Sequence, residues 1–438
     1  MVTSRWTFRR RRIIGGLGAL LLAGFLTVFA SGPANAVVRV SAPGGSYEAV
    51  RPARIVDTRT GLGAPSTGPT RMLVVATAGR AGVPATGVSA VAVNITVIGG
   101  SVPGYVSAYP AGSGGPRTSD VNFERWQTLA RMAVVPVDAA GRLTLDASAP
   151  AHLVVDVEGY FTSRQAATTR GLFNPVNPSR LMDSRGGRPA SPALGPGGLW
   201  VLQVTGRGGV PAAGVSAVVI NTTVIGPSKN GYVTDFASGS PRPATSTIDF
   251  SQGQNLSNRA IVPVGPGGRI SIYNSAGTTP LAIDVTGYFT DGVINKVGGY
   301  YVIVPASRVV DTRYWRTTSY MSTPSLKTQK IAGQRCVLSP AKTSCGRALV
   351  PPVTAVPRPI AVLLNITAVP MGPGGSLTAF AADSVQPLTS DVNYTGSAAV
   401  SNLAFVALTS QGEVSVHDSG GPADVVEDVL GYFVLPAI

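Results

Sequence analysis

The sequence predicts an all-β protein of three tandem homologous domains, each a β-sandwich or a small barrel. Two observations predict strands. Apolar residues alternate with polar ones in segments such as Leu143-Thr144-Leu145 and Ile270-Ser271-Ile272, and β-branched runs are bounded by Gly or Pro. The third observation is composition, because 53 glycines and 35 prolines among 438 residues disfavour long helices. A hydrophobic content of 44% with only 13% charged residues excludes a charged, disordered chain.

The first 36 residues have the three parts of a secretory signal peptide. Arg5 and four arginines at 9–12 form a basic start, an apolar stretch covers 13–30, and small residues ending in Ala36 form a cleavage site. A membrane anchor is the alternative, but the glycines of the stretch and the cleavage site favour export. We expect cleavage after Ala36, a linker at 37–50, and a secreted or cell-envelope protein without a transmembrane anchor. Both the general secretory and the twin-arginine route stay open.

Internal comparison shows that one unit is written three times in the rest of the chain. Each copy opens with Arg-x-x-Asp-Thr/Ser-Arg and closes with Asp-Val-x-Gly-Tyr-Phe. The openings cover 54–59, 180–185 and 308–313, and the closings cover 156–161, 284–289 and 428–433. Other motifs recur between these ends in the same order. We therefore expect three domains, which are repeat 1 at 51–163, repeat 2 at 174–292 and repeat 3 at 300–438.

The sequence leaves the arrangement of the repeats open. Each repeat has the length of a domain and about seven to nine short strands, which favours three separate sandwiches or small barrels. A single three-lobed fold built from all repeats is the alternative. The Asn-x-Thr triplets at Asn94, Asn221 and Asn365 have apolar neighbours, so we expect buried side chains bonded to backbone.

Repeat 3 carries an insertion between Tyr314 and Arg347 that contains both cysteines of the chain. A lone pair so close in the sequence of an exported protein favours a disulfide, so we expect Cys336 and Cys345 to close a surface loop. A metal site is not expected, because the only two histidines lie in other segments.

Charged residues at the two ends of each repeat are candidates for internal ion pairs. The closing Asp lies in an otherwise apolar strand, where a carboxylate is costly to bury without a partner. We expect it to contact an Arg of the opening motif and so join the ends of the repeat. A polar binding site repeated three times is the alternative. The candidates are Arg54, Asp57, Arg59 and Asp156, then Arg180, Asp183, Arg185 and Asp284, then Arg308, Asp311, Arg313 and Asp428.

No arrangement typical of an enzyme is found in the sequence. Histidine is absent from repeat 2, and His152 and His417 are not at equivalent positions. The chain lacks a Gly-x-Ser-x-Gly motif, a His-Glu-x-x-His motif, a P-loop and a dinucleotide fingerprint. We expect no catalytic residues, no metal and no cofactor, although the repeated acids leave a polysaccharide hydrolase as an alternative.

Charge is concentrated in repeat 3. Residues 291–350 contain nine basic and two acidic side chains, whereas the segment from 371 to the end contains seven acidic and no basic ones. Because basic patches attract anionic partners, the insertion is a candidate binding surface. Its candidate residues are Lys327, Lys330, Arg335, Lys342 and Arg347. Solvated surface charge is the alternative.

Tyr105 and Tyr109 are a second candidate, a platform on which sugar rings stack. Aromatic rings in β domains also serve as core, which is the alternative for these two residues. Nucleic acid is not expected as a partner, because the exported chain lacks aromatic residues interleaved with its basic ones.

Together the motifs resemble repeats in secreted proteins of actinobacteria. The resemblance rests on the opening motif, Asn-x-Thr, Thr-Ser-x-x-Asn-Phe and the closing motif, and it covers 51–435. Such repeats occur alone or appended to exported hydrolases and mostly lack an assigned function. The resemblance therefore implies a secreted, repeated β module without catalytic residues. Departures at Ser184, Asp249 and Glu413 mean that it does not imply three identical binding sites.

We expect a secreted, non-catalytic protein that binds or has a structural role at the bacterial cell envelope. Carbohydrate or an anionic wall polymer is the expected partner, and three copies would give avidity. A secreted hydrolase acting on polysaccharide and a structural surface protein without a ligand are the alternatives.

Overall fold

The computed structural model describes the chain from Gly45 to Pro436, apart from several short segments. The described ranges are 45–65, 67–164, 169–186, 192–293, 298–314, 325–334, 336–338, 343–345, 348–396 and 398–436. Residues 1–36 lie outside these ranges, so the signal peptide stays a prediction. Within the described ranges the secondary structure is all β apart from one 3-10 turn, Thr312–Tyr314. None of these ranges holds a helix long and apolar enough to cross a membrane.

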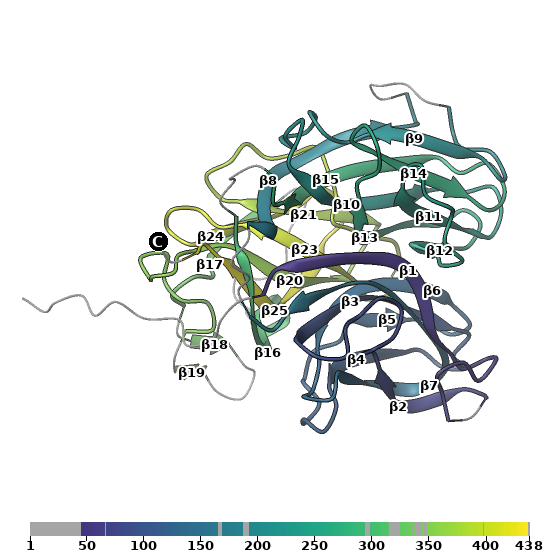
Figure 1. Ribbon diagram of the computed structural model, residues 1–438, viewed down its shortest axis with the longest axis horizontal. Coiled ribbons are helices and arrows are strands. Elements are labelled where there is room, and N and C mark those ends of the chain that lie inside the picture. Colours follow the sequence, from purple (N-terminus) through teal and green to yellow (C-terminus); the bar gives the residue numbers. More distant parts are fainter. Residues whose placement is uncertain are drawn as a thin grey trace, which may run out of the picture. The chain divides into compact units, whose positions relative to one another are not determined.

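Repeat 1 forms two layers of strands that share one long strand (Figure 1). Its strands are β1 (Tyr47–Asp57), β2 (Thr70–Ala76), β3 (Val88–Ile98), β4 (Gly104–Pro110), β5 (Val121–Phe123), β6 (Thr128–Pro136) and β7 (Arg142–Thr162). The first half of β7 pairs with β2 and β4, and its second half pairs with β1 and β3. All pairings are antiparallel. Alternating apolar residues face the space between the layers, as the period of two predicts.

Repeat 2 has the same topology in two separate four-stranded sheets, β13-β10-β15-β8 and β12-β11-β14-β9. Its strands are β8 (Arg170–Asp183), β9 (Leu199–Gln203), β10 (Val215–Ile225), β11 (Gly231–Ala237), β12 (Ile248–Phe250), β13 (Asn255–Pro263), β14 (Arg269–Asn274) and β15 (Leu281–Asp291). Val218 and Ile220 of β10 and Val285 of β15 are buried between the two sheets, whereas Val219 lies in a second cluster that the repeats share.

Repeat 3 repeats the arrangement with sheets β16-β25-β20-β23 and β17-β24-β21-β22. Its strands are β16 (Tyr300–Asp311), β17 (Ser325–Lys330), β18 (Cys336–Leu338), β19 (Thr343–Cys345), β20 (Pro359–Pro370), β21 (Gly375–Ala381), β22 (Val392–Tyr394), β23 (Val400–Ala407), β24 (Glu413–Asp418) and β25 (Ala423–Val434). Strands β18 and β19 form a separate hairpin inside the insertion. The prediction of three homologous β-sandwiches is confirmed.

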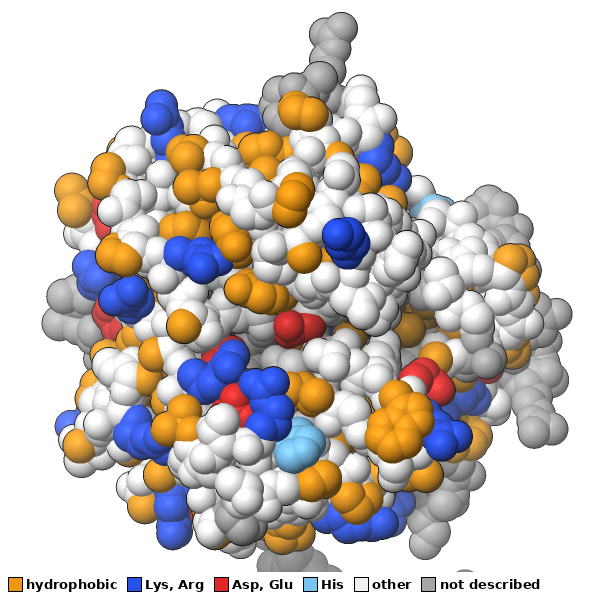
Figure 2. Space-filling model, turned by 90° about the vertical axis from the view of Figure 1, so that its right-hand side faces the viewer, with side chains coloured by type: hydrophobic (Ala, Val, Ile, Leu, Met, Phe, Trp, Pro, Cys, Tyr) orange, Lys and Arg blue, Asp and Glu red, His pale blue; other side chains and the backbone are white. Residues whose placement is uncertain are grey.

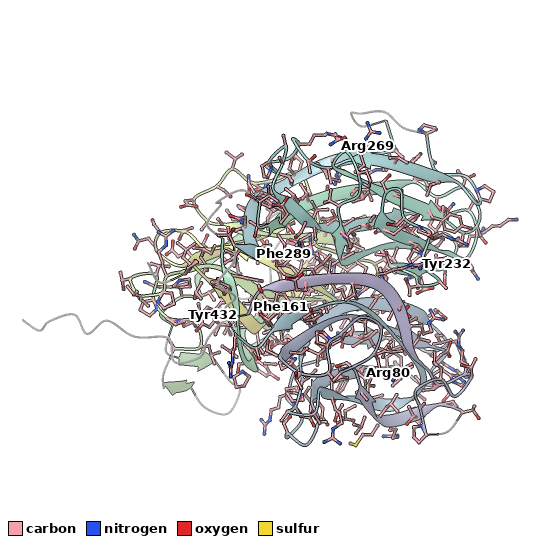
Figure 3. All side chains as sticks on the ribbon, in the orientation of Figure 1. Arg80, Phe161, Tyr232, Arg269, Phe289 and Tyr432 are labelled. Carbon is pink, nitrogen blue, oxygen red and sulfur yellow. The ribbon has the colours of Figure 1, made fainter. Side chains whose placement is uncertain are left out.

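The three sandwiches lie in one compact unit, Val38–Ile438, and share a hydrophobic cluster with members from every repeat. Its aromatic members contact one another in cyclic order. The ring centroids of Tyr47 and Phe289 are 4.5 Å apart, those of Phe173 and Phe433 are 4.4 Å apart, and those of Tyr301 and Phe161 are 4.5 Å apart. The closing Phe of each repeat thus packs against a ring from a neighbouring repeat. Figure 3 shows Phe161 and Phe289 close together inside the fold.

The glycine of each closing motif makes this packing possible. A Cβ atom on Gly159 would lie 2.2 Å from the Tyr47 hydroxyl, and one on Gly287 would lie 2.4 Å from the Phe173 ring. The equivalent Gly431 would bring a Cβ atom within 2.3 Å of the Tyr301 ring. Since real Cβ contacts are essentially never this short, only glycine fits under these rings.

Candidate functional site

The opening and closing motifs of repeat 1 meet at one place because β1 and β7 pair in register, with Arg54 opposite Asp156. The Arg54 guanidinium donates to both carboxylate oxygens of Asp156, at 2.9 and 3.2 Å. Arg59 donates to both oxygens of Asp57, at 2.9 and 2.6 Å. Arg54 also reaches Asp57 at 3.5 Å, which links the two pairs into one network.

The same network occurs in the other two repeats. In repeat 2, Arg180 pairs with Asp284 and Asp183, and Arg185 donates to Asp183 at 2.9 and 2.7 Å. In repeat 3 the Arg308 pair with Asp428 spans 2.9 and 3.2 Å, and the Arg313 pair with Asp311 spans 2.8 and 2.6 Å. The structure therefore places all twelve charged residues that we predicted from the sequence in three networks of four residues each.

In repeats 1 and 2 the pKa values of the two acids of a network shift in opposite directions. Burial raises the pKa of the closing Asp, to about 6 in Asp284, even though Arg180 favours its charged form. In repeat 2 the acid of the opening motif is slightly more exposed, and hydrogen bonds from Arg185 lower the pKa of Asp183 to about 2. Each arginine keeps an exposed side, with 28% of the Arg54 side chain and 45% of the Arg59 side chain accessible.

Each network lies against the Thr-Ser loop of a neighbouring repeat. Asn94 donates to the backbone oxygen of Ser246 at 2.6 Å, so repeat 1 contacts repeat 2. Asn221 of repeat 2 donates to the backbone oxygen of Ser390 in repeat 3, and Asn365 of repeat 3 does so to that of Ser119 in repeat 1. The asparagines are buried, as the sequence predicts, but their backbone partners belong to another repeat. Each charged network therefore lies at a boundary between two repeats.

The cleft between repeats 3 and 1, which we call the 3–1 cleft, is the best candidate for a binding site. It has a volume of 390 Å³ and is lined by Arg308 and Arg313 of repeat 3 together with Tyr105 and Arg117 of repeat 1. Tyr105 is 48% exposed. No hydrogen bond or ion pair joins Arg117 to another residue in the described ranges, and its side chain is exposed. The site thus combines three cations with an accessible aromatic ring.

The other two boundaries have different side chains at the equivalent positions. At the boundary of repeats 1 and 2, Asp249 lies near Arg54 and Arg59, and burial raises its pKa to about 6. At the boundary of repeats 2 and 3, Ser376 occupies the place of Tyr105, and Arg180 donates to the backbone oxygen of Leu388 at 3.3 Å. Figure 2 shows one face of the molecule, where basic side chains are scattered among uncharged ones and one group of basic side chains touches acidic ones.

The predicted platform of Tyr105 and Tyr109 does not form. Tyr109 is only 8% exposed, and its hydroxyl group lies 3.5 Å from Asp146. Burial of the ring removes it from contact with a ligand, so of the two tyrosines Tyr105 alone faces solvent.

The basic insertion of repeat 3 is described only in part. Lys327 and Lys330 lie on β17, an edge strand that pairs with β24. Lys327 is half-buried, and this burial lowers its pKa, whereas Lys330 is exposed. Arg335, Lys342 and Arg347 lie outside the described residues.

The cysteines lie on the hairpin of the insertion. Strands β18 and β19 place Cys336 directly opposite Cys345, a backbone register compatible with a disulfide. The side chains of both strands are outside the described part of the structure, so the disulfide stays a prediction. Within the described residues, no group of three or more His, Cys, Asp or Glu side chains could hold a metal ion.

Two arginines at the boundaries between repeats were not among the candidates that we predicted from the sequence. Arg117 lines the 3–1 cleft, and Arg131 is buried where the repeats meet, with 1% of its surface exposed. Aligning β6 with β13 and β23 would have found Arg131, because repeats 2 and 3 have Asn258 and Asn402 at that position.

No protein-family model matches the chain, and no curated protein matches it. Among solved structures, the triple jelly roll protein of an archaeal virus turret is 8% identical, with 91% of this chain and 92% of that chain covered and a TM-score of 0.19. The tandem CBM22 domains of Paenibacillus barcinonensis Xyn10C are 13% identical, with 57% and 99% covered and a TM-score of 0.15. At these TM-scores the likenesses assign no fold family and no ligand to this chain.

Proposed function

We propose that this protein is a secreted, non-catalytic binding protein of the bacterial cell envelope, and that its ligand is an anionic carbohydrate polymer held in the 3–1 cleft. The observation that carries the proposal is the convergence of Arg117, Arg308 and Arg313 beside the exposed ring of Tyr105. Guanidinium groups hold carboxylates and phosphates with paired hydrogen bonds. An exposed tyrosine ring offers an apolar face to a sugar.

Within the cleft, Arg117 is the residue best suited to the ligand's charge. Arg308 and Arg313 are both engaged by Asp428 and Asp311, so their aspartates neutralise much of their charge. Arg117 has no such partner among the described residues. A ligand anion would therefore gain most from Arg117, while the other two arginines offer their remaining donors.

Retention of the purified protein on isolated bacterial cell wall tests this proposal. We expect retention at low salt that falls as salt rises, because exposed charges are screened beyond about 10 Å at 0.1 M. Arg117→Ala and Tyr105→Ala should each weaken retention, by roughly 2- to 10-fold. Arg71→Ala is the matched control, since Arg71 is an exposed arginine on β2 whose guanidinium donates to the backbone oxygen of Ser148 and has no other partner among the described residues.

Three results would contradict the proposal. Absence of retention at low salt removes wall binding and leaves a structural role without a ligand. Equal losses in Arg117→Ala and Arg71→Ala would show that overall charge, rather than the cleft, causes retention. Release of soluble sugar from the wall during incubation would contradict the non-catalytic assignment.

A further inference from the structure

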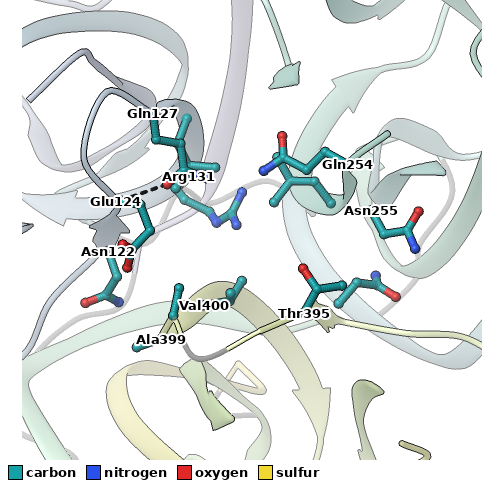
Figure 4. A pocket seen from close by; sticks show the side chains of 13 residues that line it. Asn122, Glu124, Gln127, Arg131, Gln254, Asn255, Thr395, Ala399 and Val400 are labelled. Atoms are coloured by element: carbon teal, nitrogen blue, oxygen red, sulfur yellow. Dashed lines mark hydrogen bonds between the residues drawn. The ribbon is translucent and has the colours of Figure 1, made fainter. Parts of the chain in front are cut away.

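A second polar cavity, which we call the central pocket, lies where β6, β13 and β23 of the three repeats meet. Its volume is 210 Å³, smaller than the range of about 300–1,000 Å³ typical of drug-sized ligands. Figure 4 shows Arg131 of repeat 1 pointing across this pocket toward Gln254 of repeat 2, with Val400 and Thr395 of repeat 3 on a third side.

Arg131 is a buried cation without an acidic partner. Its Nε donates to the backbone oxygen of Ser401 at 2.6 Å, and one terminal nitrogen donates to that of Ala130 at 3.0 Å. No described residue accepts from the other terminal nitrogen. The contrast is Arg259, which is fully buried but pairs with Asp391. An unpaired buried charge is costly, and this burial lowers the pKa of Arg131 to about 9.

The packing of the repeats does not require an arginine at this position. In repeat 2 the equivalent residue is Asn258, which donates to the side-chain oxygen of Asn94 at 3.0 Å. In repeat 3 it is Asn402, which donates to that of Asn221 at 2.9 Å. An asparagine at this position therefore forms a hydrogen bond across two of the three boundaries. Only repeat 1 has a cation, Arg131, at the equivalent position.

The amide side chains around the pocket also present donors. The side-chain oxygen of Gln127 accepts the backbone N–H of Glu124 at 2.9 Å, and that of Gln254 accepts the N–H of Ser251 at 3.0 Å. The oxygen of Asn255 accepts a backbone N–H at 3.0 Å in the same way. Each oxygen already accepts one hydrogen bond, whereas the three NH₂ groups have no partner among the described residues.

We propose that the central pocket binds one carboxylate-bearing monosaccharide, with its carboxylate on Arg131 and its hydroxyls on the surrounding amides. A buried guanidinium and three unpaired NH₂ groups form a set of donors that an anion satisfies. Asn122 and Ala399 line both this pocket and the 3–1 cleft, so the two sites adjoin. The assignment of a sugar rests on the proposed function, whereas the assignment of an anion rests on the pocket alone.

Calorimetric titration of the purified protein with glucuronate, glucose and acetate tests the proposal at low salt. We expect one glucuronate bound per chain, weaker binding of acetate and no binding of glucose. Arg131→Asn should weaken glucuronate binding by roughly 10- to 100-fold, because a charge-assisted hydrogen bond is lost. This change installs the residue that repeats 2 and 3 already have, so we expect an unchanged fold and a thermal midpoint at or above that of the wild-type protein, because a costly buried charge is removed.

Glu124→Gln is a second variant that leaves every contact of Arg131 in place. Glu124 is the acidic residue among those that line the pocket, and removing its charge should tighten glucuronate binding by roughly two- to fivefold. This variant keeps the test valid even if Arg131→Asn fails to fold.

Four results would overturn the proposal: no binding of glucuronate, equal binding of glucose, binding of acetate without glucuronate, or equal affinity in the wild-type protein and Arg131→Asn. Wall retention is a separate readout. Glucuronate binding without wall retention would support the central pocket as a binding site and contradict the proposed function. Wall retention without glucuronate binding would support the proposed function and contradict the central pocket as a binding site.

Discussion

Asp156 illustrates how a single carboxylate connects the two ends of a repeat. It lies in β7, is completely buried, and accepts hydrogen bonds from Arg54 of β1 with both carboxylate oxygens, while the backbone of Ser246 in repeat 2 also contacts it. Removing its charge leaves Arg54 with Asp57, at 3.5 Å, as its nearest acid.

Asp156→Asn should therefore lower the free energy of unfolding by about 1–3 kcal/mol, less than the roughly 3–5 kcal/mol of a fully buried pair, because Arg54 is partly exposed. Denaturant unfolding measures the change. The control is Asp138→Asn, which breaks the exposed pair with Arg142 and should cost less. Equal effects of the two substitutions would contradict a role for burial.

Residue types at repeated spacings could be predicted from the sequence, and residues that break the repeat could not. The recurrence of Arg54 and Asp156 in three copies indicated the ion pairs, since a costly buried acid needs a partner. Asn94 was correctly expected to bond to backbone, but sequence carries no signal that the backbone is Ser246 of another repeat. Arg131 departs from the repeat in one copy only, so comparison of recurring residues gives no signal for it.

At the scale of the element, the closing strand is the least tolerant part of the fold. In β15 the absence of a side chain on Gly287 admits the ring of Phe173 from β8. Gly287→Ala should destabilise the protein by roughly 1–3 kcal/mol through overpacking. Thermal unfolding measures the loss.

Gly195 is the matched control in the same repeat, because a Cβ atom there would meet nothing within 4 Å. Gly195→Ala should leave the thermal midpoint nearly unchanged. A drop as large as that of Gly287→Ala would mean that backbone freedom, rather than the aromatic contact, explains the glycine.

Alternation of apolar and polar residues was sufficient to predict strands, but not where they end. Strand β1 begins at Tyr47, inside the segment 37–50 that was interpreted as a linker. Strand β7 continues from Arg142 to Thr162 through both layers of repeat 1. Packing of Tyr47 against Phe289 of repeat 2 explains the early start of β1, and a local pattern does not report such a contact.

The same limit explains why the sequence could not choose between separate domains and a shared core. Tyr47 and Phe173 lie outside the predicted repeats 51–163 and 174–292, so their contacts with the closing Phe residues were hidden. The shared cluster joins sandwiches that each keep their own layers. The structure thus combines the two alternatives, because three sandwiches are present and one cluster of side chains joins them.

At the scale of the whole molecule, buried acids should make stability depend on pH. Burial raises the pKa of Glu158 to about 8 and those of Asp235 and Glu427 to about 7. Folded protein then holds more protons than unfolded chain between about pH 4 and 8, so the free energy of unfolding should fall as pH rises through this range. Each pKa unit of difference is worth about 1.4 kcal/mol per group.

Denaturant unfolding at pH 5, 6, 7 and 8 measures this trend, and Glu158→Gln should flatten it by removing the group with the highest pKa. Below about pH 4 the trend should reverse, because hydrogen bonds from Arg185 hold the pKa of Asp183 at about 2 and that contribution is lost in acid. Stability that rises steadily from pH 5 to 8 would contradict the assignment.

The cyclic contacts between repeats also fix their number. Asn365 of repeat 3 donates to the backbone oxygen of Ser119 in repeat 1, and Asn94 of repeat 1 donates to that of Ser246 in repeat 2. Every copy therefore has a neighbour on both sides. Linear repeat proteins need specialised end copies to cover exposed faces, and their length can vary by whole repeats. In this chain no copy is an end copy, and a fourth would have to break a boundary to enter. Substitutions and insertions within a copy leave the three boundaries intact, and Arg131 and the insertion of repeat 3 are examples.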